Sequence, residues 1–423
     1  MARLQPVRGT HDLLPDQMRR HRNVVDVARN VVGLYGFEEV ATPIFEFTQV
    51  FSRTLGDTSD IVTKEMYSFE DRNGDHLTLR PENTAGVARS FISEGLAQQI
   101  PLKYFYAGPM FRRERPQKGR LRQFHQVGIE LIGVASPAAD IDVIAAGYRV
   151  LSDLGLREQV TLELNTLGDP ESRENYRNAL IAYLTPHLGN LSTESQERFR
   201  RNPLRILDSK NEVDQAIVAD APEFAGFLTE ESRLFFDNVK EGLERIGVPY
   251  KLNPRLVRGL DYYGHTAFEF TTSALGAQGT VLAGGRYDGL IKLMGGPPTP
   301  GVGWAAGIER LAMLMEADLA KQPIVALAPL GDLATEKVQQ LGEFLRGNGF
   351  VVDVGYSGNL SRRMKRADKL NAAVIVIIGD DDGLAPNFFR KLDDIIEKYP
   401  DISAISTNAG YYYHPDVEDL YGD

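Results

Sequence analysis

A helical segment that interrupts a strand-rich sequence is the feature that most limits how this chain can fold. The strand patterns of residues 37–167 give way to helical patterns over residues 170–247, and strand patterns return near residue 253. A helical block between two halves of one mostly antiparallel sheet indicates an insertion. Because 423 residues also exceed what one hydrophobic core usually organises, we expect two or three domains.

The pattern changes again after a polar stretch at 316–323 that ends in proline. Strands and helices then alternate with short connections, which favours a small α/β unit with a parallel sheet. We expect strands at 324–328, 350–354 and 372–378, and helices at 335–346 and 360–370. The sequence therefore predicts one domain over residues 1–320, with the helical insertion at about 170–247, and a second domain over residues 321–423.

Shorter elements are expected within the first domain. A helix over 20–35 is followed by a strand over 37–44 that carries Pro43 near its end. The Asn73-Gly74 pair predicts a hairpin turn between strands at 64–69 and 76–80. Further strands are expected at 102–107, 124–132, 267–272 and 280–283, and further helices at 140–154 and 308–315.

Charge is distributed unevenly along the chain. The net charge of −11 comes from 47 basic and 58 acidic residues, and by itself it speaks against a nucleic-acid partner. Residues 103–122 nevertheless hold seven basic residues and one acidic residue, whereas residues 380–423 hold eleven acidic and three basic residues. Salt screens charges beyond ~10 Å at 0.1 M ionic strength. The basic strip can therefore bind phosphate despite the acidic total.

Several functional classes are excluded by what the sequence lacks. Without cysteine there are no disulfides, thiolate nucleophiles or cysteine zinc sites. No P-loop, H-E-x-x-H or G-x-S-x-G motif is present, and the seven histidines never fall at i, i+4, so we expect no metal site. The glycines of 301–307 lack dinucleotide-binding spacing, and we predict that they allow close backbone packing. No apolar run approaches the ~18 residues of a membrane span, and no secretory signal opens the chain, so we expect a cytoplasmic protein without membrane contact.

The segment 111–130 carries the strongest chemical signal. A strand, a charged loop broken by proline and glycine, and a returning strand predict a hairpin whose arginines can converge on a polyphosphate. Side chains alternate along a strand, so Gln126 and Glu130 are expected on one face. From the residues alone, a solvated charged hairpin is the alternative.

Motifs in this segment and elsewhere resemble those of a known enzyme class. Phe111-Arg112-x-Glu114, with the distant Arg310, resembles motifs 2 and 3 of class II aminoacyl-tRNA synthetases, and Gly36-Phe37 followed by Pro43 resembles motif 1. Residues 256–263 and 283–290 resemble the two signature peptides of the histidyl-tRNA synthetase family, and residues 79–85 and 202–210 match it as well. The matches keep the family order over residues 8–382, and after that point the sequence leaves the family pattern, with an amphipathic helix expected at 387–398.

The resemblance implies a fold and an activity. The implied fold is α/β, with an α+β catalytic domain: a class II antiparallel sheet of six or seven strands with flanking helices, an inserted helical domain and a C-terminal α/β anticodon-binding domain. The implied activity is histidine–tRNA ligation, in which histidine and ATP form histidyl-adenylate and the histidyl group passes to the 3′ end of histidine tRNA. It also implies Mg²⁺ with the ATP, and a homodimer.

The resemblance assigns ATP contacts to four arginines and a glutamate. Arg112 would hold the α-phosphate, and Arg310 the far end of the bent triphosphate. Arg120 would add a polyphosphate contact, and Glu114 would lie near the adenine. Arg258 would bridge the histidine carboxylate and the α-phosphate, where negative charge builds up during the reaction. Arg112 and Arg258 are therefore the expected catalytic residues.

A second set of residues is expected to bind histidine. Glu82, Thr84 and Gln126 match the family's ligands for the α-ammonium group, alongside Arg258 at the carboxylate. Glu130 and Tyr263 match the residues that face the two ring nitrogens, and hydrogen bonds to both give steep discrimination between amino acids. The pocket lining is expected to include Tyr262 and Tyr287, with aromatic core filling as the alternative for Tyr262.

Two basic segments are expected to contact tRNA. Arg115 and Gln117 lie at the predicted hairpin tip, where the family reads the extra 5′ guanosine of histidine tRNA and the discriminator base. The predicted helix over 360–370 would bind the anticodon stem through its cations, with a salt-dependent affinity. These cations include Arg362, Arg363, Lys365 and Arg366.

Two other functions remain as alternatives. The synthetase-like regulatory subunit of ATP phosphoribosyltransferase usually lacks the C-terminal domain and loses catalytic arginines, whereas Arg112, Arg258 and Arg310 are present here. Another class II synthetase, such as the threonyl or prolyl enzyme, is disfavoured by the peptide at 258–263 and by the lack of clustered zinc ligands.

Overall fold

The computed structural model contains two compact units, Met1–Ala317 and Asp318–Asp423. In the first, it describes residues 3–54, 65–115, 119–207, 209, 211–256, 262–276 and 279–315. In the second, it describes residues 321–379 and the backbone of residues 405–406. Among these residues, no helix combines the length and the apolar character needed to cross a membrane.

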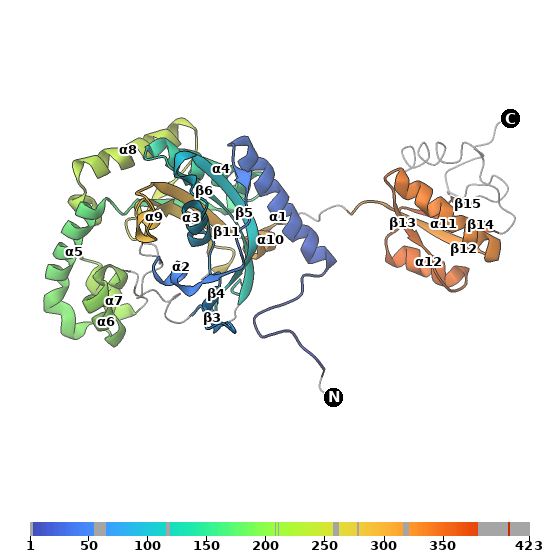
Figure 1. The fold of residues 1–423 in the computed structure, drawn as a ribbon, viewed down its shortest axis with the longest axis horizontal. Helices are drawn as coiled ribbons and strands as arrows, with labels where there is room; N and C mark the ends of the chain where they lie inside the picture. The colour runs from blue at the N-terminus through green and yellow to red at the C-terminus, as the bar shows by residue number, and fades with distance from the viewer. Residues whose placement is uncertain are drawn as a thin grey trace. The chain divides into compact units, whose positions relative to one another are not determined.

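The first unit is built around an eight-stranded sheet (Figure 1). In spatial order its strands are β1 (Glu38–Glu39), β5 (Leu102–Phe111), β6 (Gln123–Ile132), β11 (Gly301–Gly307), β10 (Thr280–Arg286), β9 (Gly264–Thr271), β7 (Thr161–Thr166) and β8 (Lys251–Leu252). The run from β5 to β7 is antiparallel throughout, as expected. The expectation of six or seven strands was too low because β1 and β8, two residues each, add to the edges in parallel.

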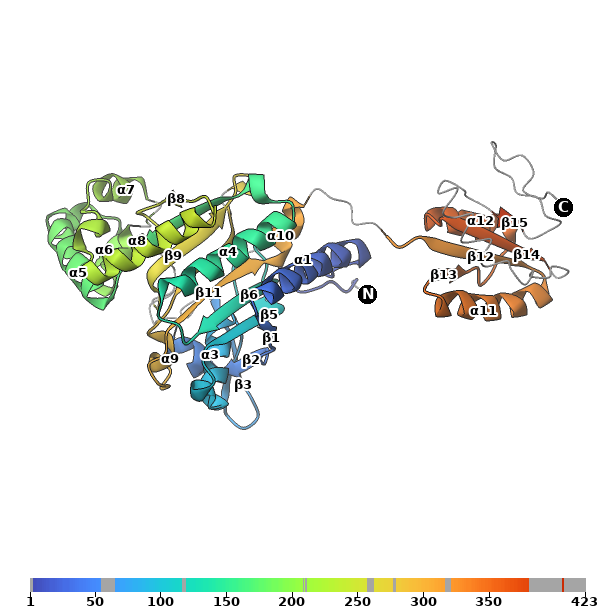
Figure 2. The ribbon, with the colours of Figure 1, turned by 90° about the horizontal axis from the view of Figure 1, so that it is seen from above.

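Long helices cover one face of this sheet (Figure 2). They are α1 (Pro15–Leu34), α4 (Pro137–Asp153) and α8 (Glu230–Arg245), with α10 (Ile308–Leu314) against α1. Apolar residues of α1 recur at helical spacing on its buried side, as at Val24, Ala28 and Val31. The indole N–H of Trp304 on β11 donates to the Val143 carbonyl of α4 (2.9 Å), which fixes helix against strand.

The opposite side of β5 packs against α3 (Thr84–Ser93) and α9 (Leu290–Leu293). Successive side chains of β5 point to opposite faces of the sheet. The Phe105 ring lies near Arg29 of α1, whereas the next residue, Tyr106, belongs to the buried cluster with Phe91 of α3. A second, three-stranded sheet lies beyond this cluster. Its strands run in the order β2 (Phe45–Phe47), β4 (His76–Leu79) and β3 (Tyr67–Glu70), and α2 (Thr48–Ser52) follows β2.

The strand expected over 37–44 is wrong over its second half. The structure has β1 at Glu38–Glu39 and then no strand until Phe45, where the chain joins the small sheet. Pro43 cannot donate a hydrogen bond, and residues 40–44 cross from one sheet to the other. The expected hairpin is confirmed, with Gly74 at a φ of 87° in the turn.

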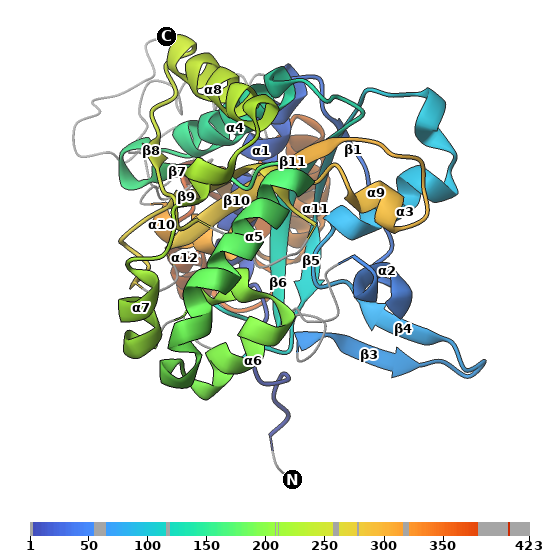
Figure 3. The same cartoon turned by 90° about the vertical axis from the view of Figure 1, so that its left-hand side faces the viewer.

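A helical segment follows β7, as the sequence predicted. It comprises α5 (Pro170–Leu184), α6 (Thr193–Arg201), α7 (Glu212–Val218) and the 3₁₀ turns η4 (Thr185–Asn190), η5 (Pro203–Ile206) and η6 (Phe224–Phe227), before α8. It has its own apolar core around Tyr176 and Leu180. Figure 3 views the molecule with this segment toward the reader. Elsewhere in the unit lie the 3₁₀ turns η2 (Leu96–Gln98) and η3 (Arg157–Gln159).

The second unit has a four-stranded parallel sheet, in the order β13 (Val351–Val354), β12 (Ile324–Leu330), β14 (Val374–Gly379) and β15 (Ile405–Ser406). Helices α11 (Asp332–Gly347) and α12 (Leu360–Lys369) connect its strands. The expected alternation over 324–378 is confirmed. The helix expected at 387–398 lies outside the described residues.

Candidate active site

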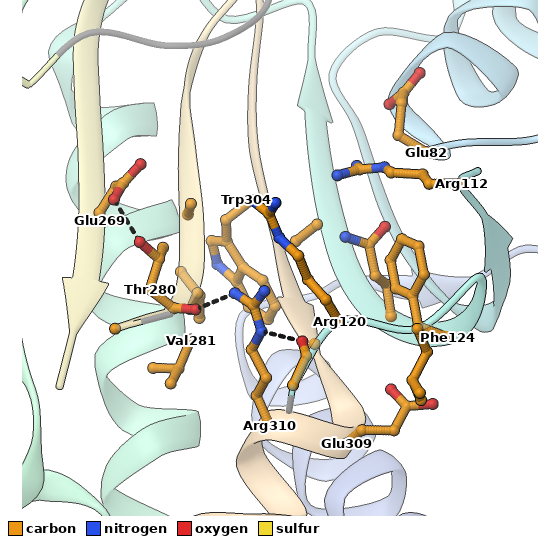
Figure 4. A pocket seen from close by; sticks show the side chains of 18 of the residues that line it. Glu82, Arg112, Arg120, Phe124, Glu269, Thr280, Val281, Trp304, Glu309 and Arg310 are labelled. Carbon is orange, nitrogen blue, oxygen red and sulfur yellow. Dashed lines mark hydrogen bonds between the residues drawn. The ribbon is translucent and has the colours of Figure 1, made fainter. Parts of the chain in front are cut away.

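A cavity of about 1080 Å³ lies in the first unit (Figure 4). Its walls come from α1, the β5–β6 hairpin, strands β9 to β11 and α10. Most of the site residues expected from the sequence line it together: Glu82, Thr84, Arg112, Glu114, Arg120, Gln126, Glu130, Tyr262, Tyr263, Tyr287 and Arg310. Segments separated by more than 200 residues in the chain thus meet at one place.

Glu130 is the most strongly held of these side chains and is 1% exposed. Its Oε1 accepts from the Thr84 hydroxyl (2.7 Å) and the Tyr106 hydroxyl (3.4 Å), and its Oε2 accepts from the Tyr287 hydroxyl (2.5 Å). Burial raises the pKa of Glu130 to about 8, although these hydrogen bonds favour the charged form. The carboxyl is therefore fixed in position.

The glycines of β11 leave room for this carboxylate. Gly303 pairs with Glu130 across the sheet, and a Cβ on Gly303 would lie 2.0 Å from Glu130 Oε2. Such a distance is far inside van der Waals contact, so only glycine fits. The prediction that the glycines of 301–307 serve close packing is confirmed at this position.

Glu82 anchors the start of α3 beside Glu130. Its carboxylate accepts from the backbone N–H of Thr84 (2.6 Å) and of Ala85 (3.0 Å). Burial raises the pKa of Glu82, and the two backbone donors oppose that shift. Because Thr84 also donates to Glu130, the two carboxyl groups are joined through one residue.

Gln126 and Glu130 both face this cavity, so the predicted shared strand face is confirmed. Within the described part of the chain, the buried Gln126 Oε1 has no hydrogen-bond partner. Buried polar atoms are nearly always paired, so this oxygen is available for a ligand donor.

Three tyrosine rings close the same end of the cavity. The Tyr262 and Tyr263 ring centroids are 4.7 Å apart, and the Tyr262 and Tyr287 rings meet at 79°. All three belong to the buried apolar cluster under α3 and also line the cavity. Both alternatives for Tyr262, cavity lining and core filling, therefore hold. The Tyr263 carbonyl accepts from Arg173 Nη1 of α5 (2.9 Å), which ties the helical segment to this wall.

Arg112 lies beside Glu82, whereas Arg120 and Arg310 lie farther along the cavity, toward α10 (Figure 4). Arg112 donates from Nε to the Pro81 carbonyl (2.9 Å), and its guanidinium lies 5.2 Å from the centre of the Phe124 ring. Arg120 forms a 2.8 Å ion pair with Glu114.

Arg310 donates from Nε to the Gly119 carbonyl (3.0 Å) and from Nη1 to the Thr280 carbonyl (2.7 Å). Burial lowers the pKa of Arg310, and the charges of Arg120 and Arg112 lower it further. Cations held close together against their repulsion form a site that attracts an anion.

Two of the expected site residues, Arg258 and Gln117, lie outside the described residues. Arg115 is described and exposed. The four expected anticodon-stem residues belong to α12 of the second unit, where Arg366 pairs with Asp353 (2.8 Å). The structure therefore brings together the expected histidine and ATP residues that it describes.

The structure also adds residues to the cavity that the sequence analysis did not select. Tyr106 contacts Glu130, and Phe124 and Trp304 form part of the wall. Glu163 of β7 and Glu269 of β9 also line it and are paired across the two strands. The alternation of residues 161–166, with leucine at 162 and 164, was the available signal for the direction of Glu163.

Comparison with known proteins identifies the family of both parts of the chain. A family model described as histidyl-tRNA synthetase matches residues 9–311, and one described as anticodon binding domain matches residues 324–384. The histidine–tRNA ligase of Rhodospirillum rubrum is 62% identical over 383 residues, which cover 90% of this chain and 92% of that protein.

Among solved structures, apo histidyl-tRNA synthetase of S. aureus is 35% identical, with a TM-score of 0.76 over 89% of this chain and 92% of that chain. A structure from Bacillus halodurans titled as an ATP phosphoribosyltransferase regulatory subunit/histidyl-tRNA synthetase is 22% identical, with a TM-score of 0.65 over 90% of this chain and 99% of that chain. At this identity the second likeness concerns the fold alone.

Proposed function

Because the chain belongs to the histidyl-tRNA synthetase family and is an aminoacyl-tRNA ligase for histidine, we propose that histidine and ATP react in the cavity just described. The observation that supports this most directly is the order of groups along the cavity. Glu82, Thr84 and Glu130 form one hydrogen-bonded group, Arg112 lies beside Glu82, and Arg120 and Arg310 lie farther along, toward α10. The carboxylates suit the ammonium group and ring N–H of histidine, and the arginines suit a polyphosphate.

At the carboxylate end, Glu82, Thr84 and Gln126 bind the α-ammonium group of histidine. Glu130 and Tyr263 take the two ring nitrogens, and Tyr262 and Tyr287 enclose the ring. Support comes from the buried, fixed carboxyl of Glu130 and from the unpartnered Oε1 of Gln126. Buried hydrogen-bonding groups reject ligands that leave them unpaired, which favours histidine over apolar amino acids.

Arg112, beside Glu82, holds the α-phosphate, and Arg120 and Arg310 hold the outer phosphates farther along the cavity, with Glu114 near the adenine. The histidine carboxylate attacks the α-phosphorus in line and pyrophosphate leaves. The adenylate then passes its histidyl group to a ribose hydroxyl at the 3′ end of tRNA. The protein aligns the reactants and neutralises developing charge, and Arg258 bridges carboxylate and α-phosphate.

Mg²⁺ accompanies the ATP in this proposal. Magnesium keeps several waters and is usually bound by one or two carboxylates together with substrate phosphates. Glu163 and Glu269 offer such a pair, since they face each other on adjacent strands and line the cavity. These two residues would hold the ion, which would neutralise phosphate charge when bound.

The two units divide the work between them. We assign adenylate formation to the first unit, with residues of about 170–247 as its insertion, and anticodon binding to the second unit through α12. Arg115 and Gln117 read the extra 5′ guanosine and the discriminator base of histidine tRNA. The enzyme works in the cytoplasm, where tRNA is charged.

ATP–pyrophosphate exchange across the twenty amino acids, with Mg²⁺ present, tests the proposed reaction. Histidine alone is expected to drive exchange. Exchange with threonine or proline would contradict the assignment of the cavity, and a lack of exchange with every amino acid would favour the regulatory-subunit alternative.

Histidine affinity is expected to rise as the pH is raised through neutrality and to level off above about 8. Burial raises the pKa of Glu130, so its carboxyl is mostly protonated in the ligand-free protein at neutral pH. The ring N–H of bound histidine donates to the carboxylate and favours it over the protonated form, so binding below this pKa releases a proton. Calorimetry in buffers of different ionisation enthalpy measures that release. Glu130→Gln is expected to bind histidine more weakly and without proton release, and an equal release from both proteins would contradict the role of Glu130.

We also propose that the chain forms a homodimer through the small sheet. Strand β2 lies at the edge of that sheet and exposes apolar side chains, with Phe45 54% and Phe47 50% exposed. Edge strands and exposed apolar patches favour association about a twofold axis. Phe47→Asp is expected to shift the mass measured by light scattering toward 47.0 kDa at micromolar concentration. Leu252→Asp, equally exposed (55%) on the edge strand β8, is the control that should leave the dimer intact.

A further inference from the structure

Two histidines and a glutamate meet where α1, β6 and α10 come together. The side chains of His21, His125 and Glu309 each offer one ligand atom, and these atoms all lie within 4.8 Å of one another. In the described part of the chain, this is the one group of three or more histidine, aspartate or glutamate side chains that converges in this way. Glu309 lies beside Phe124 at the α10 end of the cavity (Figure 4).

Glu309 holds the ring of His125 in place. Its Oε1 lies 2.8 Å from His125 Nδ1, and both of its oxygens accept from the His125 backbone N–H at 3.0 Å. Carboxylates that contact a histidine ring fix its orientation and raise its basicity, as they do around metal ions in proteins.

His21 lacks such a partner. Its side chain is only 9% exposed, and neither ring nitrogen has a hydrogen-bond partner among the described residues. Its ring meets the ring of His125 edge to face, with 4.7 Å between centroids. Both ring nitrogens of His21 are therefore available to a metal ion.

We propose that His21, His125 and Glu309 bind one zinc ion. Two histidines and one glutamate form a ligand set that zinc uses in proteins when its fourth position stays open to water or a ligand. Imidazole nitrogens suit zinc, whereas magnesium prefers an octahedron of oxygens. Zinc–nitrogen bonds of about 2.0–2.1 Å require the three ligand atoms to move closer than 4.8 Å. Rotation of the unpartnered His21 side chain supplies that movement.

This site was not expected from the sequence, because its ligands come from three elements with no regular spacing. The chain has no cysteine, so no thiolate site competes for zinc. The inference does not depend on the proposed reaction, since metal binding is measured without histidine, ATP or tRNA.

The test uses the full-length chain without a histidine tag, stripped of metal by a chelator. Titration with Co²⁺, followed by its visible absorption, and displacement of Co²⁺ by Zn²⁺ are expected to give one site per chain. Excess Mg²⁺ is kept present so that carboxylate pairs such as Glu163 and Glu269 do not contribute. His21→Gln is expected to weaken zinc binding at least tenfold. His187→Gln, a histidine of η4 outside the cluster, should bind zinc like the unaltered chain.

Thermal unfolding provides a second measurement that does not require the variant to bind metal. Zinc is expected to raise the melting temperature of the unaltered chain and of His187→Gln, but not that of His21→Gln. Because His21 makes no hydrogen bond through its ring in the described structure, His21→Gln should fold. If His21→Gln does not fold, the proposal is judged by the stoichiometry of metal binding and the cobalt spectrum of the unaltered chain. Absence of saturable binding, an octahedral cobalt spectrum, or zinc binding by His21→Gln equal to that of the unaltered chain would overturn the proposal.

Discussion

Replacement of Arg112 by glutamine is expected to slow histidine-dependent ATP–pyrophosphate exchange by roughly 10²–10³-fold, the usual effect of removing one preorganised charge-stabilising donor. The guanidinium is held between the Pro81 carbonyl and the Phe124 ring before any substrate arrives. Its charge is therefore in position when negative charge grows on the α-phosphate. The effect should fall on kcat more than on the dissociation constant of histidine, because Arg112 is proposed to contact the phosphate of ATP and not the histidine.

Arg113→Gln is the matched control. Arg113 is the next residue along the chain, and its side chain is exposed. It is expected to leave exchange within about twofold of the unaltered chain, because exposed charges contribute little. An equal loss of exchange activity in both variants would show that the basic residues of 103–122 act through their overall charge and not through the placement of Arg112.

Replacement of Gly303 by alanine is expected to have the second-largest effect, a loss of about 100-fold in kcat/KM for histidine in the exchange reaction. The new methyl group would lie 2.0 Å from Glu130 Oε2 and 2.3 Å from the Ile129 carbonyl oxygen. The backbone atom cannot yield, so the carboxyl of Glu130 has to move away from Thr84 and Tyr287. A displacement of about 1 Å at a substrate-positioning group is enough for a loss of this size.

Overpacking should also lower the stability of this variant by about 1–3 kcal/mol, measured by denaturant unfolding. Gly289→Ala is the control, since a Cβ there meets no atom within 4 Å and the residue's φ of −85° suits alanine. If Gly303→Ala kept the full kcat/KM for histidine, the close approach of β11 to Glu130 would not be needed for function.

Much of the cavity could be predicted from the sequence because strands impose a simple geometry. Alternation alone placed Gln126 and Glu130 on one face, and the glycine run was correctly expected to allow close packing. The identities of the carboxylates and arginines came from motif resemblance, which carries no distances. The strand over 37–44 failed because local pattern does not show where a chain leaves one sheet for another.

Other features depend on tertiary contacts that no spacing reveals. Tyr106 lies in a strand that the sequence predicts, but nothing in its spacing shows that its hydroxyl reaches Glu130. His21, His125 and Glu309 are separated by more than 100 and more than 180 residues, so their meeting follows only from the packing of α1 and α10 against β6. Charge and periodicity describe single elements, whereas these groups arise between elements.

The way Glu130 is held has a consequence for how the protein is made. Its hydrogen-bond donors lie 46, 24 and 157 positions away in the chain, and Gly303 must pair beside it. The two nearer donors precede the helical segment, whereas Tyr287 and β11 follow it. During synthesis the whole helical segment is therefore made before the last residues around Glu130 are available to complete its pocket. Contacts of such long range form late in folding, so the capacity to select histidine appears only when the central sheet is complete. A chain that ends before residue 287 lacks Tyr287 and β11 and cannot select histidine. Histidine binding therefore indicates that the central sheet is complete.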